Sequence, residues 1–177
     1  FFFDNGILKS IISGIEIAIF DILAQANNTN HALIMKNFFK YKQKIINKVN
    51  IYSSAGSIKS NLTDLRKDID ISKKLNIFIF KGRLALNKNI SPKLSILQNE
   101  IDNYAVDLIA NSFEKNNDLK KLDRLLKIIK SKKPIWIEEV LKTDYLFKFL
   151  KIKKYGLNFS YGENFNSLID FINLLEI

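Results

Sequence analysis

The segment KKPIWIEEVLKTD, residues 132–144, contains the most informative pattern for the fold of this chain. An apolar run from Pro134 to Ile137 is typical of a buried strand, and it ends abruptly at two adjacent carboxylates, Glu138 and Glu139. A similar ending follows at YGEN, where Glu163 comes after another apolar run. These acidic strand ends either form a site together or are rim charges that pair with nearby lysines. Their spacing alone leaves both interpretations open.

Strand-like runs and helical segments alternate on both sides of this segment. Amphipathic helical patterns fill the intervals at 62–74, 91–103, 118–131, 143–154 and 165–176. The strand ends recur about every 25 to 30 residues, the period of one strand plus one helix, and they fall near Ser53, Lys81, Ile109, Glu138 and Glu163. This alternation predicts an α/β protein with parallel strands buried on both faces.

Two architectures satisfy this pattern, an open doubly wound sheet and a (β/α) barrel. The sequence contains no G-x-G-x-x-G loop and no Walker lysine loop, as a dinucleotide or nucleotide fold would require. The polar strand ends favour the barrel, since barrel enzymes carry functional side chains at the carboxyl ends of several strands. A closed barrel needs eight strands and about 250 residues. We therefore predict a partial TIM-type (β/α) barrel of about five βα units in residues 47–177.

Residues 1–46 are predicted to form a separate helical segment. Isoleucines recur at helical spacing between Ile7 and Ala26, and the turn formers NNTN end this pattern before a second short helix. The chain opens with three phenylalanines and its only methionine is Met35. A normal translation start is therefore missing, and we expect a fragment.

Composition excludes several classes of protein. The chain of 177 residues is 47% hydrophobic but has no apolar run long enough to span a bilayer and no signal-peptide pattern, so we expect a cytoplasmic protein without membrane contacts. The absence of cysteine excludes disulfides and thiolate metal sites. The net charge of +10 is spread along the chain, and its densest cluster, 119–133, lies on the solvated face of an amphipathic helix. We therefore expect no nucleic-acid partner.

Glu138 and Glu163, carried on neighbouring strands, are predicted to face the same rim of the barrel. Carboxylate oxygens are ligands for hard cations such as Mg²⁺, and a cation would relieve the repulsion between the two charges. Glu139 should point away from Glu138 and hold a neighbouring group. Lys81, at the end of an earlier strand, would converge on the same mouth.

Several motifs together resemble a known family. These are GIEIAIFDILAQ (14–25), VNIYSSAG (49–56), IFIFKGR (77–83), IANSF (109–113), WIEEV (136–140) and YGEN (161–164). Their order and separations are similar to those of the mandelate racemase and muconate lactonising enzyme branch of the enolase superfamily. The resemblance implies that residues 1–46 are a remnant of an N-terminal capping domain. It also implies a Mg²⁺-dependent lyase or isomerase that removes the proton α to a carboxylate, on a small carboxylate or acid-sugar substrate.

The resemblance also assigns residues. It places Glu138 and Glu163 as metal ligands, Lys81 and Arg83 at the catalytic K-x-K positions, and Ser53, Asn111, Glu139 and Asn164 next to the substrate or the ligands. Two departures weaken the site. The family's first metal ligand, the Asp of D-x-N, aligns with Ile109, and Asp107 would lie roughly 7 Å too deep to replace it. Arg83 stays protonated and cannot readily serve as a base.

Two functional classes follow. The chain is either a diverged or truncated member of this branch, with Mg²⁺ binding weak or lost, or a non-catalytic scaffold that has lost the metal site. The open edge of an incomplete barrel promotes pairing with another chain, so a homo-oligomer is expected in either case.

Overall fold

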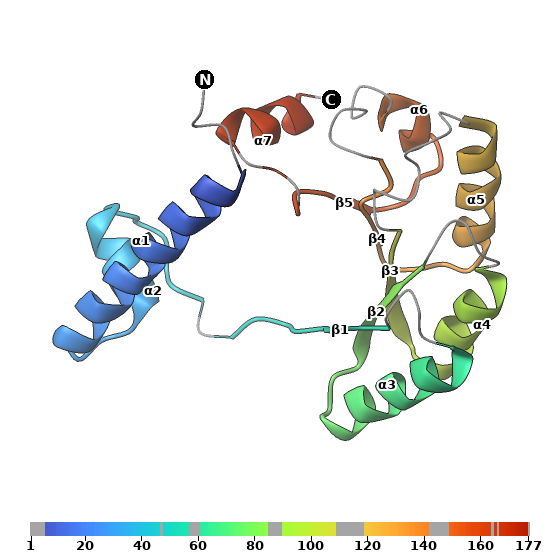
Figure 1. Cartoon of the computed structure of the whole chain (residues 1–177), viewed down its shortest axis with the longest axis horizontal. Helices are drawn as coiled ribbons and strands as arrows, with labels where there is room; N and C mark the ends of the chain where they lie inside the picture. Colours follow the sequence, from blue (N-terminus) through green and yellow to red (C-terminus); the bar gives the residue numbers. More distant parts are fainter. Residues whose placement is uncertain are drawn as a thin grey trace. The chain divides into compact units, whose positions relative to one another are not determined.

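The protein is described from a computed structural model that defines residues 6–46, 48–56, 61–84, 90–108, 119–141, 149–163, 165 and 167–176. The chain divides into two compact units, Phe1–Asn50 and Ile51–Ile177, each with its own packing (Figure 1). Among the helices of the described ranges, none has the length and apolar character needed to cross a lipid bilayer.

The first unit is a pair of helices, α1 (Gly6–Ala26) and α2 (His31–Phe38). The side chain of Asn30 caps α2 by accepting a hydrogen bond from the backbone amide three residues later, at 2.9 Å. The ring of Phe20 on α1 stacks on that of His31, with 5.8 Å between the ring centroids. The only histidine of the chain therefore packs against an aromatic ring of its own unit.

The second unit is a parallel sheet with the strand order β1-β2-β3-β4-β5. Its strands are β1 (Ser53–Ala55), β2 (Ile79–Arg83), β3 (Asn103–Asp107), β4 (Ile137–Glu138) and β5 (Phe159–Ser160). The helices that follow them are α3 (Leu62–Lys74), α4 (Ser91–Glu100), α5 (Leu119–Ser131), α6 (Phe149–Lys153) and α7 (Leu168–Leu175). Five βα units were predicted, and the structure confirms them.

The sheet is curled. Tyr52 precedes β1 and Trp136 precedes β4, so three strand spacings separate them, about 14 Å in a flat sheet. Their rings nevertheless meet edge to face with centroids 5.3 Å apart. The sheet must therefore bend toward the face that carries these rings. This curvature, together with the strand order, confirms the predicted partial barrel.

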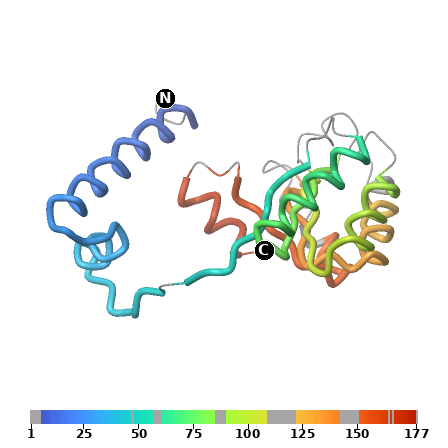
Figure 2. The backbone as a smooth tube through the Cα atoms, turned by 90° about the horizontal axis from the view of Figure 1, so that it is seen from below, coloured from blue at the N-terminus to red at the C-terminus, as the bar shows by residue number. Residues whose placement is uncertain are grey.

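Helices α3, α4 and α5 cover the convex face of the sheet (Figures 1 and 2). Leu122, Leu126 and Ile129 recur on α5 at helical spacing and are buried, as the sequence pattern predicted. The core joins sheet and helices, and it includes Phe80, Val106, Ile137, Leu65, Ile69, Leu94, Leu97, Leu126 and Ile129. On the outer surface, an ion pair of 2.7 Å between Arg66 Nε and Glu100 Oε1 joins α3 to α4. The helix layer fixes the strands, and the strand ends in turn position the site.

Candidate functional site: a carboxylate cluster at the strand ends

The register of the sheet places polar side chains on its concave face. Successive residues of a strand point to opposite faces, and paired residues of parallel strands share a face. Arg83 pairs with Asp107, and Asp107 pairs with Glu138. Lys81, two residues before Arg83, lies on this face as well. Phe80, one residue before Lys81, points to the opposite face and is buried in the core on the helix side.

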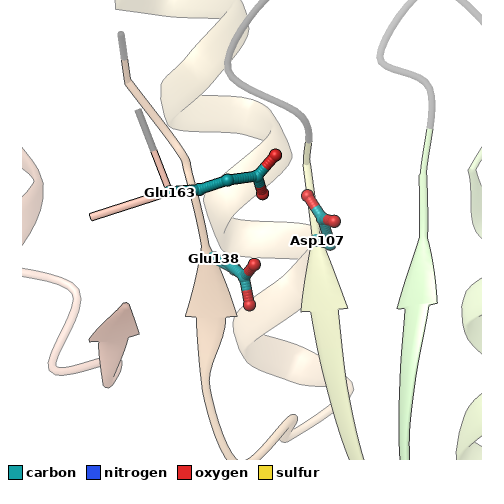
Figure 3. A group of neighbouring side chains, drawn as sticks. All are labelled: Asp107, Glu138 and Glu163. Carbon is teal, nitrogen blue, oxygen red and sulfur yellow. The ribbon is translucent and has the colours of Figure 1, made fainter. Parts of the chain in front are cut away.

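Three carboxylates meet at the carboxyl ends of the strands. Asp107, Glu138 and Glu163 each offer a carboxylate oxygen, and these oxygens all lie within 4.8 Å of one another. Figure 3 shows Asp107 and Glu138 at the ends of neighbouring strands, with Glu163 extending toward them from the next segment. Asp107 is 2% exposed and Glu138 is 9% exposed, whereas Glu163 is exposed. The cluster is thus buried on the side of Asp107 and Glu138 and open to solvent on the side of Glu163.

The position of Asp107 corrects one expectation from the sequence. Asp107 was expected to lie roughly 7 Å too deep, because the strand was expected to continue to Ile109. The strand β3 ends at Asp107, which pairs directly with Glu138. Asp107 is therefore level with the other two carboxylates. The signal in the sequence was a single carboxylate, Asp107, inside an otherwise apolar run from Tyr104 to Ala110.

Lys81 is the buried counter-ion of Glu138. Its Nζ lies 2.7 Å from Oε1 and 2.8 Å from Oε2 of Glu138, and the residue is 5% exposed. The ring of Tyr52 lies below the ammonium group, 5.4 Å from Nζ to the ring centroid. Burial alone lowers the pKa of Lys81, but the hydrogen bond and the charge of Glu138 outweigh it and hold this pKa above the ordinary value of 10.5. Lys81 is therefore an ammonium ion at neutral pH.

Arg83 provides the second positive charge of the site. Its Nε donates to Oδ2 of Asp107 at 3.3 Å, and its side chain is 47% exposed while that of Asp107 is 3% exposed. The guanidinium group therefore reaches from the buried carboxylate to the open side of the cluster. Lys81 and Arg83 together balance two of the three negative charges.

Glu139 serves the loop after β5. It is 2% exposed, and its Oε1 accepts hydrogen bonds from the backbone amides of Gly162, at 2.9 Å, and Glu163, at 3.1 Å. Its own amide donates to the carbonyl oxygen of Ser160 at 3.0 Å. Glu139 therefore ties the end of β4 to the segment that carries the third carboxylate.

Of the other predicted site residues, only Ser53 lies within the part of the chain that the structure describes. Ser53 pairs with Phe80, on the helix side of the sheet, and Ser54 pairs with Lys81. Because side chains alternate along β1, Ser54 lies on the face of the sheet that carries the cluster, and Ser53 lies on the opposite face. Ile109, Asn111 and Asn164 lie outside the described residues. Sequence reasoning also missed the Tyr52 and Trp136 pair, because only the curvature of the sheet brings these rings together.

The residues present suit a hard divalent cation. All three donors are carboxylate oxygens, which favour Mg²⁺, Mn²⁺ or Ca²⁺ over softer metals. Oxygens that share an octahedral Mg²⁺ lie about 3 Å apart when adjacent and about 4 Å apart when opposite. The cluster, with oxygens up to 4.8 Å apart, must contract slightly to bind such an ion directly. The exposed side chain of Glu163 has the freedom to provide this movement.

Solved structures share this architecture. A racemase from Streptomyces coelicolor A3(2) with bound magnesium is 21% identical, with a TM-score of 0.59 over 71% of this chain and 39% of that chain. A 3,6-anhydro-D-galactonate cycloisomerase from Zobellia galactanivorans is 14% identical, with a TM-score of 0.71 over 99% of this chain and 47% of that chain. An enolase from Bradyrhizobium complexed with magnesium and mandelic acid is 15% identical, with a TM-score of 0.73 over 96% of this chain and 45% of that chain. The chain has the fold of enolase-superfamily structures.

This fold likeness confirms the architecture that the motifs predicted. The chain spans less than half the length of the structures that it matches. No family model matches the sequence, and no curated protein matches it. At these levels of identity the likeness establishes the enolase-superfamily fold, while the chemistry must be argued from the site.

Proposed function

We propose that this chain carries the cation-binding and carboxylate-binding part of an enzyme of the mandelate racemase branch of the enolase superfamily. The observation that carries the proposal is the meeting of Asp107, Glu138 and Glu163 at the ends of neighbouring parallel strands. The reaction would be removal of a proton α to a carboxylate, in a lyase or isomerase acting on a small carboxylate or acid sugar. Neighbouring structures hold magnesium, and one holds mandelic acid.

In this proposal Asp107, Glu138 and Glu163 hold Mg²⁺, which when bound stabilises negative charge on the carboxylate oxygens of the substrate. Lys81 stays protonated against Glu138, so it orients that carboxylate and adds positive charge to the site. Arg83 anchors Asp107 through Nε, and its planar fork of donors suits an incoming carboxylate at the open side. Both groups favour an anionic substrate.

The proposal predicts a metal affinity that depends on each carboxylate. Calorimetric titration of Mg²⁺ or Mn²⁺ should give a dissociation constant at least about tenfold higher in Asp107→Asn, Glu138→Gln and Glu163→Gln, because affinity follows the number of ligand charges. Asp123→Asn is the matched control, since Asp123 pairs with Lys127 on α5 at 2.7 Å, on the helix side. Equal binding by the wild type, the three carboxylate variants and the control would contradict the proposed metal site.

A non-catalytic scaffold is the second candidate, and Lys81 and Arg83 favour it. Lys81 is held as an ammonium ion by Glu138, and the guanidinium group of Arg83 has no free lone pair that could accept a proton. Neither group is suited to accept a proton from a substrate at neutral pH.

Exchange of the α-proton separates the two candidates. The Mg²⁺-loaded protein is incubated in D₂O with a small 2-hydroxy carboxylate, and incorporation of deuterium at the α-carbon is followed by NMR. Exchange above the protein-free rate, lost in Glu138→Gln, supports the enzyme. Binding of the carboxylate without exchange supports the scaffold.

A further inference from the structure

Glu139 has an unusual backbone conformation for its residue type. Its φ is +51°, in the left-handed region that residues with a Cβ atom rarely adopt. The residue is also 2% exposed, so a carboxylate has been removed from water. Both features carry a cost in free energy, and they persist only where the surrounding structure fixes them.

The left-handed bend redirects the side chain of Glu139 toward the neighbouring strand. In a regular strand, Glu139 would simply point to the face opposite Glu138. Instead its Oε1 receives two hydrogen bonds from consecutive amides, those of Gly162 and Glu163. A third hydrogen bond, from the amide of Glu139 to the carbonyl of Ser160, joins the same two segments. The end of β4 is thus bound to the backbone that carries Glu163.

Glu163 is the member of the cluster that needs such support. Asp107 and Glu138 belong to β3 and β4 and are held by the ladder between these strands. Glu163 lies three residues beyond the end of β5 and is exposed. Its backbone is held by the carboxylate of Glu139, and a carboxylate is a stronger acceptor of amide hydrogen bonds than a neutral group.

We propose that Glu139 is the positioning residue of the cation site, which fixes the backbone of Glu163 so that its carboxylate meets Asp107 and Glu138. The inference rests on the function proposed above. It divides the work of the two adjacent glutamates: Glu138 faces the cation, and Glu139 acts through Glu163 without touching the ion. Both carboxylates at the end of β4 then contribute to the same cation site, one directly and one through Glu163.

The test compares variants of Glu139 with Mn²⁺ as the probe, measured by electron paramagnetic resonance. Glu139→Ala keeps the Cβ atom and removes the acceptor, and its dissociation constant for Mn²⁺ should rise about tenfold or more. Glu139→Gln keeps a carbonyl oxygen that accepts from both amides, and the constant should rise by less than about threefold. Glu100→Ala removes a glutamate that pairs with Arg66 on the helix side, and it should bind Mn²⁺ as the wild type does.

Hydrogen exchange gives a readout that does not depend on the metal. The amides of Gly162 and Glu163 should exchange faster in Glu139→Ala than in the wild type, and Glu139→Gln should retain most of the protection. If Glu139→Ala folds poorly, Glu139→Gly replaces it, since glycine adopts a positive φ without steric cost. The affinity expected of Glu139→Gly is the same as that of Glu139→Ala.

The outcomes distinguish this inference from the function on which it rests. Wild-type affinity in Glu139→Ala or Glu139→Gly overturns the role of Glu139 and leaves the cation site standing. Equal losses in Glu139→Ala and Glu139→Gln also overturn it, since the hydrogen-bond acceptor would then not matter. A wild-type protein that binds no Mn²⁺ overturns both proposals.

Discussion

Replacing Glu138 with alanine is expected to lower the free energy of unfolding by about 3 kcal/mol, because the substitution leaves a buried ammonium group without its partner. Both carboxylate oxygens of Glu138 lie within 2.8 Å of Lys81 Nζ, and the side chains of Lys81 and Glu138 are 7% and 12% exposed. Urea unfolding followed by the fluorescence of Trp136, the only tryptophan, measures this loss.

The double variant Lys81→Met/Glu138→Leu tests the cause. Removal of both charges leaves no unpaired group, and replacing a buried ion pair with apolar side chains is often neutral or stabilising. The double variant should therefore recover most of the stability that Glu138→Ala loses, although it cannot bind a cation through this position. A double variant as unstable as Glu138→Ala would show that the loss has another origin.

Replacing Phe80 with alanine is expected to cost about 3 to 5 kcal/mol, the largest effect that we predict for one side chain. Phe80 is the second residue of β2, is fully buried at 0% exposure, and belongs to the core between the sheet and its helices. Removal of the ring loses its burial and leaves a cavity that the surrounding side chains fill only in part. Urea unfolding of the variant provides the measurement.

Phe78→Ala is the matched control. Phe78 lies two residues earlier in the same NIFIF segment but is 58% exposed. The loss of its ring should change the free energy of unfolding by less than about 1 kcal/mol. Similar losses at positions 78 and 80 would contradict the difference in burial between these two side chains.

The sequence was sufficient for the order of the elements and for the direction of the strands. Helical spacing on α5 and the short apolar runs before Lys81, Glu138 and Glu163 are local patterns, and each is set by the need to bury one face. Repetition of strand and helix at a constant period then leaves few architectures other than parallel βα units. The ordered motifs narrowed these to a partial barrel of the enolase-superfamily type.

The sequence failed where the answer depended on pairing between strands. Asp107 was expected to lie two residues too deep, whereas the ladder pairs it directly with Glu138. Ser53 was chosen as a site residue, whereas the register gives that face to Ser54. Since side chains alternate with a period of two, an error of one residue moves a side chain to the other face, and only the hydrogen-bonded ladder fixes the register.

The residues by themselves determined which chemical groups this protein has: acidic strand ends, one lysine and one arginine on the same strand, and a core of alternating βα units. Only the tertiary structure decided which of these groups meet. The curvature of the sheet brings Lys81 on β2 to Glu138 on β4 and joins Tyr52 to Trp136. The bend at Glu139 ties the backbone of Glu163 to the end of β4. Such contacts depend on the summed twist and register of several strands, and no local pattern of residues encodes that sum.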